Sequence, residues 1–176
     1  VSGAMPLMIV SDHLTEIAEA LLRKVLELAW TDLLPRFGPP ECVVDGVKRE
    51  ARFAILAYGK LGGIELNYGS DLDLVFLHDI TELLQRTPRA WVAGNKELFT
   101  LHIYPNAFFA KLVQRIIYLL TTRTGAGDLY EVDTRLRPSG RAGLLVSSFE
   151  AFAEYQQHQA WTWEHQALAR TRAVAG

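Results

Sequence analysis

The sequence predicts one globular domain of the α/β or α+β class. Two short apolar segments of strand length, residues 52–58 and 72–77, are joined by a glycine-rich loop. Longer segments on both sides carry apolar residues at helical spacing. With 176 residues, 49% hydrophobic and 22% charged, the chain is large enough to bury a core, and strands flanked by helices fit either of these classes.

The first half is expected to contain one long helix and the two strands. A helix is predicted over residues 13–34, with Ser11 and Asp12 as its N-cap and Pro35 as its stop. Strands follow at residues 52–58 and 72–77, and the loop between them is expected to include a short helical turn. Residues 80–94 are interpreted as a polar surface connection and residues 95–104 as a short helix.

The second half is expected to alternate between helices and strands. A helix is predicted from residue 107 to about 124, capped by Asn106, followed by a strand over residues 128–137. A short strand at 144–146 and a helix from the Ser148 cap to about 157 come next. The last predicted helix runs from 161 to roughly 172. Alternation would give the strand at 128–137 one charged face, made of Glu131, Asp133, Arg135 and Arg137.

Composition limits the class of protein. The net charge of −2 does not favour nucleic-acid binding, and no apolar run of 18 residues predicts a membrane span. Cys42 is the lone cysteine, which excludes an internal disulfide and leads us to expect the reducing cytoplasm. Val1 at the start, without a basic leader, leads us to expect a fragment of a longer chain.

Asp71 and Asp73 are the main candidate site. Aspartates two apart on a strand point to the same face, and they repel each other unless a cation lies between them. Oxygen ligands favour Mg²⁺ or Mn²⁺, which takes further ligands from substrate phosphates. Gly62 and Gly63 suit a backbone that approaches a phosphate, although the loop matches neither a Walker A nor a dinucleotide fingerprint. The alternative is a solvated edge strand with no ion.

Asp133 is the candidate third carboxylate. Two-metal phosphoryl chemistry holds its ions about 4 Å apart, and a carboxylate from a neighbouring strand would complete such a cage. The alternative is an ion pair with Arg135 or Arg137, and Glu131 is a weaker rival for the same role. Lys60, Arg135 and Arg137 are candidate phosphate contacts, with solvation or a structural carboxylate as their alternatives.

Several linked motifs resemble one family. They are residues 59–63, residues 70–74, residues 132–138, residues 139–146 and residues 161–168. Together they resemble the glutamine synthetase adenylyltransferases, which belong to the polymerase-β-type nucleotidyltransferases, and the similarity covers most of residues 6–176. The resemblance implies an α+β fold with a small mixed sheet flanked by helices. It also implies a helical segment at 1–40 and a catalytic domain at 41–176.

The resemblance also implies a reaction and a site. The family enzyme is bifunctional and much longer, and residues 137–146 and 160–168 are similar to its C-terminal, adenylylating half. That half transfers AMP from ATP to a tyrosine of glutamine synthetase, with release of pyrophosphate, and so regulates nitrogen assimilation. Asp71, Asp73 and Asp133 would be the catalytic Mg²⁺ ligands, and Gly59, Gly69 and Ser70 would line the triphosphate. Glutamine and the PII signal protein would act through the full-length enzyme.

Two other functions stay open at this point. One is phosphorolytic removal of AMP from adenylylated glutamine synthetase, against which Ser139, Gly140 and His165 argue. The other is a non-catalytic nucleotide-binding regulatory domain, against which the acidic triplet argues. Trp161, Trp163 and His165 are interpreted as packing or partner surface rather than catalytic groups.

Overall fold

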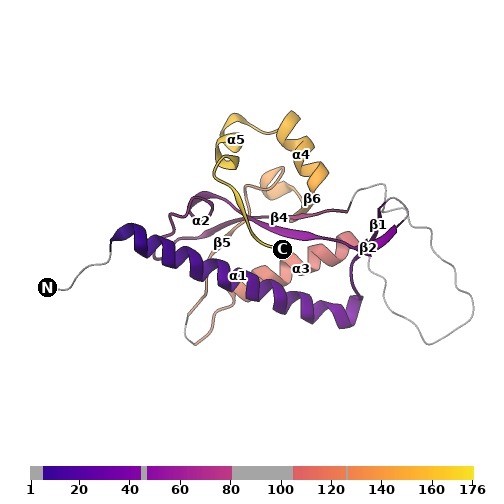
Figure 1. The fold of residues 1–176 in the computed structure, drawn as a ribbon, viewed down its shortest axis with the longest axis horizontal. Helices are drawn as coiled ribbons and strands as arrows, with labels where there is room; N and C mark the ends of the chain where they lie inside the picture. Colours follow the sequence, from indigo (N-terminus) through magenta and orange to yellow (C-terminus); the bar gives the residue numbers. More distant parts are fainter. Residues whose placement is uncertain (1–5, 45–46, 81–104, 126) are drawn as a thin grey trace, which may run out of the picture.

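The protein folds as helices around a small mixed sheet (Figure 1). The computed structural model describes residues 6–44, 47–80, 105–125 and 127–176. Its elements are α1 (Leu7–Phe37), β1 (Glu41–Val44), β2 (Val47–Glu50), β3 (Phe53–Ala57), α2 (Gly59–Gly62), β4 (Leu72–His78), α3 (Pro105–Thr121), β5 (Val132–Asp133), η2 (Gly140–Ala142), β6 (Val146–Ser148), α4 (Phe149–His158), α5 (Thr162–Leu168) and β7 (Arg172–Ala175). The predicted α+β class is confirmed.

Strand β4 is the centre of the five-stranded sheet. On one side it pairs with β3, which is antiparallel to both β4 and β7. On its other side it pairs in parallel with two short strands, β5 near its start and β6 near its end. Strands β1 and β2 form a separate antiparallel hairpin. The start of β4 therefore lies between the glycine loop that precedes it and β5.

Alternation along β4 separates a core face from a site face. Leu72, Leu74 and Phe76 belong to the main hydrophobic core, which includes buried residues of α1 and α3. Val75 and Leu77 point to the opposite face, where they pack in a second cluster with residues of α4 and the end of α5. Figure 1 shows α1 and α3 on one side of the sheet and α4 and α5 on the other. Asp73 has the same parity as the second set and lies on the α4 and α5 side.

Aromatic rings tie α1 and α3 to the sheet. Trp30 of α1 meets the edge of Phe108 at a centroid distance of 5.3 Å, and Phe109 stacks on Phe53 of β3 at 5.5 Å. Phe109 also stacks on His78 at 5.1 Å, and burial lowers the pKa of His78 to about 4. A neutral His78, whose Nδ1 accepts the Ile80 N–H at 3.2 Å, therefore belongs to the core.

The first helix differs from the prediction at both ends. It begins at Leu7 rather than residue 13, because Ser11 lies on the buried face, within the helix, and is not its cap. Pro35 does not stop it: the proline lies within the last turn, and the helix continues to Phe37. Gly38, at φ 69°, donates its N–H to the Leu34 carbonyl and ends the helix.

The second half contains two larger corrections. The strand predicted at 128–137 is only Val132–Asp133, because the chain turns immediately after Asp133. The last helix ends at Leu168, and Arg172–Ala175 forms β7 on the edge of β3. No strand was predicted for these residues, and they become one through pairing with β3.

Smaller differences concern the remaining elements. Helix α3 begins at Pro105 and ends at Thr121, so Asn106 lies inside it and the predicted end near 124 is too late. The short strand expected at 144–146 is Val146–Ser148, and the β1–β2 hairpin had not been predicted. Apart from Ile80, the predicted connection at 80–94 and helix at 95–104 lie outside the described residues. The division at residue 40 stays a prediction.

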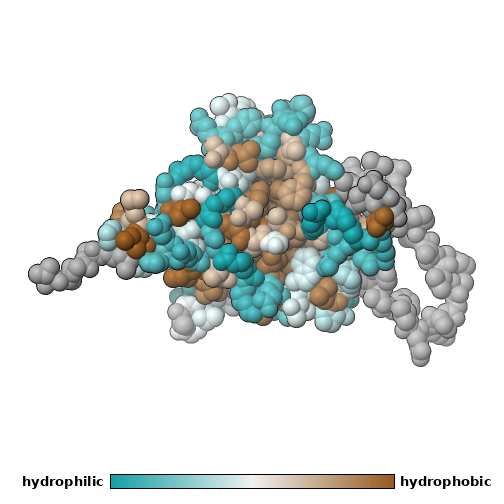
Figure 2. Space-filling view, viewed as in Figure 1, coloured by the Kyte–Doolittle hydropathy of each residue, from teal (hydrophilic) through white to brown (hydrophobic). Residues whose placement is uncertain are grey.

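The surface mixes polar and apolar residues. Figure 2 shows hydrophobic residues at the start of α1, where Leu7 and Met8 are exposed, and a mainly hydrophilic surface over α4 and α5. Within the part of the chain that the structure covers, we find no helix with the length and apolarity needed to cross a bilayer.

Leu22 of α1 should be a principal stabilising residue, because it is fully buried in the main core. Leu22→Ala should lower the free energy of unfolding by about 3 kcal/mol through lost burial and the cavity left behind. Urea unfolding followed by circular dichroism measures this. Ile17→Ala is the matched control on the same helix, where the side chain is 52% exposed and the loss should stay within about 0.5 kcal/mol. Equal losses in both variants would contradict the assigned burial.

Candidate metal and phosphate site

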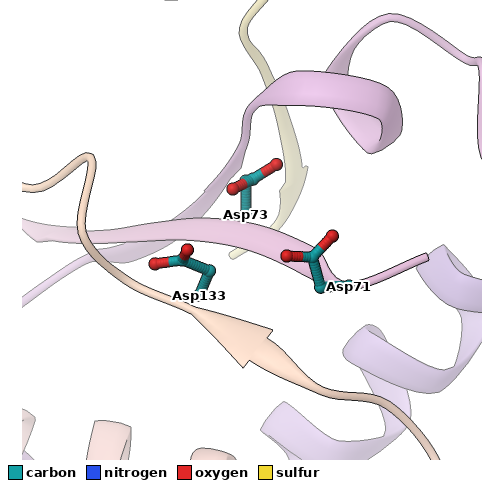
Figure 3. Close-up of side chains that lie close together, drawn as sticks. All are labelled: Asp71, Asp73 and Asp133. Atoms are coloured by element: carbon teal, nitrogen blue, oxygen red, sulfur yellow. The ribbon is translucent and has the colours of Figure 1, made fainter.

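Three carboxylates gather at the start of β4 (Figure 3). Asp71 immediately precedes the strand, Asp73 is its second residue, and Asp133 ends β5. Each has a carboxylate oxygen within 4.8 Å of the oxygens of the other two. Asp73 and Asp133 are direct partners in the parallel β4–β5 register, so their side chains leave the same face. The structure thus brings together the residues that the sequence predicted as a cluster.

Backbone hydrogen bonds hold these residues in place. The Leu72 N–H donates to the Glu131 carbonyl at 2.9 Å and joins β4 to β5. The Tyr58 N–H donates to the Asp73 carbonyl at 2.9 Å and joins the glycine loop to the same strand. Leu72 and Leu74 are fully buried on the core face. A slip of one residue in β4 would expose these leucines and bury the aspartates, so the core fixes the direction of the carboxylates.

Gly59 is packed directly against the Asp73 carboxylate. Its φ of 55° lies in the left-handed region, and a Cβ placed on it would collide with the Asp73 Oδ2. The sequence assigned Gly59 to the triphosphate through its backbone. The structure adds a more direct reason for glycine here: any side chain would push one of the three carboxylates out of position.

Arg135 contacts both oxygens of Asp133. The Arg135 backbone N–H donates to Oδ1 at 2.8 Å, and Nε donates to Oδ2 at 2.6 Å. The Nη2 atom makes an ion pair with the same Oδ2. The bond from the N–H two residues ahead is an Asx turn, a local alternative to the strand ladder, and it explains why β5 ends at Asp133.

The two paired aspartates have opposite electrostatic environments. Burial, reinforced by the negative charges of Asp71 and Asp133, raises the pKa of Asp73. The side-chain hydrogen bond from Arg135, with its backbone bond and charge, lowers the pKa of Asp133. The charges of Arg135 and Lys60 offset this effect on Asp73 only in part, and a cation bound beside Asp73 would compensate for the rest.

An open cleft of about 470 Å³ adjoins the carboxylates. Its lining residues are Asp71, Glu131, Val132, Asp133, Thr134, Arg135, Arg137 and Arg141. Three arginines beside three aspartates give a site that suits a metal together with a polyanion such as a phosphate chain. Arg141 had not been singled out as a phosphate contact, and only its place in a basic stretch of sequence pointed to it.

Arg137 is fixed within the protein. Its guanidinium is buried and donates to the Thr134 carbonyl and hydroxyl at 2.7 and 2.6 Å, and to the carbonyls of Gly143 and Arg141 at 3.3 Å. The expected placement of Arg137 on one exposed face with Asp133 is wrong, because the turn at Thr134 redirects it. These contacts hold the loop of residues 134–143 together, and phosphate binding by Arg137 stays a prediction.

The other predicted phosphate contacts belong to α2 and to the turn before Asp71. Lys60 is exposed on α2, and its charge acts on Asp73. Gly69 has a φ of 71°, and the Ser70 hydroxyl accepts the Asn67 N–H at 3.1 Å, which closes the turn before Asp71. Contact of Lys60, Gly69 or Ser70 with a nucleotide stays a prediction. Glu131 is exposed at the cleft wall and is not a member of the carboxylate cluster.

Glu164 is a structural residue that the sequence analysis missed. It is buried, and its Oε1 accepts the Tyr155 hydroxyl at 3.1 Å and the Trp161 N–H at 3.3 Å. This joins α4 to the start of α5 above the site face. A glutamate three residues after the N-cap is a capping-box signal. Here the N-cap is Trp161 instead of serine or threonine, and this concealed the signal. Trp161 and Trp163 themselves are exposed, and the His165 ring meets the Gln156 carbonyl.

Comparisons with known proteins give one consistent result. The model of the glutamate-ammonia ligase adenylyltransferase family matches residues 1–176. A bifunctional glutamine synthetase adenylyltransferase/adenylyl-removing enzyme of Thioalkalivibrio sulfidiphilus is 57% identical over the whole chain. The protein of the same name from Hahella chejuensis is 52% identical over 98% of it. The chain spans 17% of the length of each of these relatives.

Gly59→Ala should weaken divalent-metal binding. The new methyl group would displace the Asp73 carboxylate, and we expect about tenfold lower affinity for Mn²⁺, measured by electron paramagnetic resonance. Gly140→Ala is the matched control: its φ of 53° imposes similar backbone strain, but the nearest atom to its Cβ is 3.5 Å away. Equal Mn²⁺ affinity in both variants would show that the contact with Asp73 is unimportant.

Asp73→Asn should have opposite effects on stability with and without metal. Because the fold raises the pKa of Asp73, the ionised carboxylate destabilises the folded state above that pKa, and the cost disappears as the pH falls. The amide should therefore raise the urea midpoint at neutral pH in a chelating buffer. It should also abolish the rise in midpoint that Mg²⁺ gives the wild type.

Glu131→Gln is the control for this experiment, since Glu131 lies beside the cluster but outside it. It should retain the stabilisation by Mg²⁺. Loss of that stabilisation in Glu131→Gln, with retention in Asp73→Asn, would move the metal site to Glu131.

Proposed function

The chain belongs to the glutamate-ammonia ligase adenylyltransferase family, and from this premise we propose that it carries a Mg²⁺-dependent nucleotidyl-transfer centre. The reaction we assign to it is transfer of AMP from ATP to a tyrosine of glutamine synthetase, with release of pyrophosphate. The observation that supports this most strongly is the convergence of Asp71, Asp73 and Asp133 beside an arginine-lined cleft.

The residues present fit a hard divalent metal. All three candidate ligands are carboxylates, and burial together with the charges of Asp71 and Asp133 raises the pKa of Asp73 despite the nearby charges of Arg135 and Lys60. When bound, Mg²⁺ would supply charge neutralisation for the triphosphate and acidify the attacking hydroxyl. Asp71, Asp73 and Asp133 would hold it, while the rest of the site has to bind and orient the two substrates.

The cleft supports the positioning of a triphosphate. Arg135 and Arg141 lie at its wall, and guanidinium groups bind phosphate oxygens through paired N–H donors. The tyrosine oxygen would attack the α-phosphorus in line as the bond to the leaving pyrophosphate breaks. Stabilisation of that charge by fixed donors, together with orientation, accounts for most of the acceleration expected in such a transfer.

The acceptor proton has to leave a phenol whose ordinary pKa is about 10. The Arg135 hydrogen bonds lower the pKa of Asp133, so its carboxylate is a weak base for this proton. We therefore assign Asp133 to holding the cation rather than to removing the proton.

The direction of transfer rests on motif similarity. Residues 139–140 and 161–165 are similar to the adenylylating half of the family, and the names of the relatives cover both addition and removal of AMP. We further propose that the protein acts in the cytoplasm. Glutamine and the PII signal protein would act through segments of the longer enzyme.

Labelling of glutamine synthetase tests this proposal. Purified protein, Mg²⁺, ATP labelled at the α-phosphate and glutamine synthetase should give label on a tyrosine, located by mass spectrometry. Asp73→Asn should reduce the rate by at least about 100-fold, because it removes a carboxylate that would hold the cation opposite the charge of the transition state. The wild type and Asp73→Asn should also be compared in a protein as long as the relatives.

Two results would contradict the proposal in different ways. Release of ADP from adenylylated glutamine synthetase and phosphate, without labelling from ATP in either length of protein, would assign the chain to AMP removal. Binding of ATP that depends neither on Mg²⁺ nor on Asp73, without transfer in either direction, would assign it to a non-catalytic nucleotide-binding domain.

A further inference from the structure

We propose that Arg135 is an exchangeable cation of this site: it neutralises Asp133 in one arrangement and, when a metal–nucleotide complex binds, leaves Asp133 for a phosphate group. The inference deepens the proposed function and rests on it. It assigns Arg135 a second position, in contact with the nucleotide, and makes its side chain a competitor of the metal.

The geometry divides the contacts of Asp133 into a fixed and a movable part. Oδ1 accepts the Arg135 backbone N–H, a bond built into the turn that ends β5. Oδ2 accepts the side-chain Nε and pairs with Nη2. A metal bound by all three carboxylates would compete with the arginine side chain for Asp133, and the side chain can release Oδ2 while the backbone bond keeps the carboxylate oriented.

The exposure of Arg135 makes this exchange inexpensive. Its side chain is 63% exposed, whereas that of Asp133 is 14% exposed. Ion pairs at the protein surface typically change an equilibrium constant by only about two- to fivefold. A divalent cation carries twice the charge of a guanidinium and would act on three carboxylates at once, so it should displace the arginine from Asp133.

The cleft provides a destination for the displaced guanidinium. Arg135 lines the cleft together with Asp71 and Arg141, and its charge also acts on Asp71 and Asp73. Its planar donors match the spacing of phosphate oxygens. The other two arginines of this cleft differ. Arg137 is fixed by four protein acceptors, and Arg141 acts on Asp133 through space.

The test compares metal binding with and without a nucleotide. Arg135→Gln should bind Mn²⁺ alone about two- to fivefold more tightly than the wild type, measured by electron paramagnetic resonance. The same variant should bind a non-hydrolysable ATP analogue with Mg²⁺ roughly tenfold more weakly, measured by calorimetry. A change of opposite sign in the two measurements is the signature of an exchange, since a merely structural arginine would not improve metal binding.

Arg141→Gln is the matched control, because it removes an equal charge from the same cleft without breaking a bond to Asp133. Its gain in affinity for Mn²⁺ should be smaller than that of Arg135→Gln. In the wild type, the Arg135 Nε–H resonance, identified by its loss in Arg135→Gln, should shift when Mg²⁺ and the analogue are added together. Urea unfolding of each variant verifies that the exposed substitutions leave the fold intact.

The outcomes separate this inference from the proposed function. Binding of Mn²⁺ that Asp73→Asn abolishes, with equal gains in Arg135→Gln and Arg141→Gln, would overturn the exchange and leave the proposed function standing. If Arg135→Gln bound the ATP analogue as tightly as the wild type, the exchange would likewise be overturned and the proposed function would stand. Failure of the wild type to bind Mn²⁺ at all would overturn the metal-dependent function and the exchange together.

Discussion

The site depends on one constraint, the parallel pairing of β4 with β5 in a register that places Asp73 beside Asp133. Only two residues of β5 take part, so this pairing contributes little to stability by itself. Its register is enforced from the opposite face, where Leu72 and Leu74 are buried among residues of α1 and α3. The apolar face of the strand therefore determines where its polar face points.

Bringing three carboxylates together works against folding, and the structure compensates for only part of this cost. Asp133 is neutralised by Arg135, whereas Asp73 is partly buried next to a glycine and has a raised pKa. Such locally unfavourable electrostatics persist in proteins when the surrounding structure overdetermines them and when a ligand later compensates. The large core around Phe108 and Phe109 provides the surplus stability that this arrangement requires.

The sequence predicted those parts of the fold whose signals are local. The apolar strand at 72–77, the two aspartates on one of its faces and the helix of α3 follow from periodicity. Alternation along the second strand put both Asp133 and its weaker rival Glu131 on one face, and only the structure shows that Asp133 joins the two aspartates. Strand β7 could not be predicted in this way, because residues 172–175 become a strand only through pairing with β3. The reach of α1 back to Leu7 was hidden by Ser11, a good cap that is buried inside the helix.

The turn after Asp133 shows why the prediction of the charged face failed while the prediction of the site succeeded. Strict alternation would have placed Asp133, Arg135 and Arg137 in one exposed row. Instead, the Asp133 carboxylate accepts the Arg135 N–H, the strand ends, and Arg137 turns inward to bind the carbonyls of its own loop. The same acidic side chain thus ends the strand and faces the other carboxylates. Because a strand ladder would have used the N–H that Asp133 needs, the end of the strand is a condition of the site rather than a defect in the sheet.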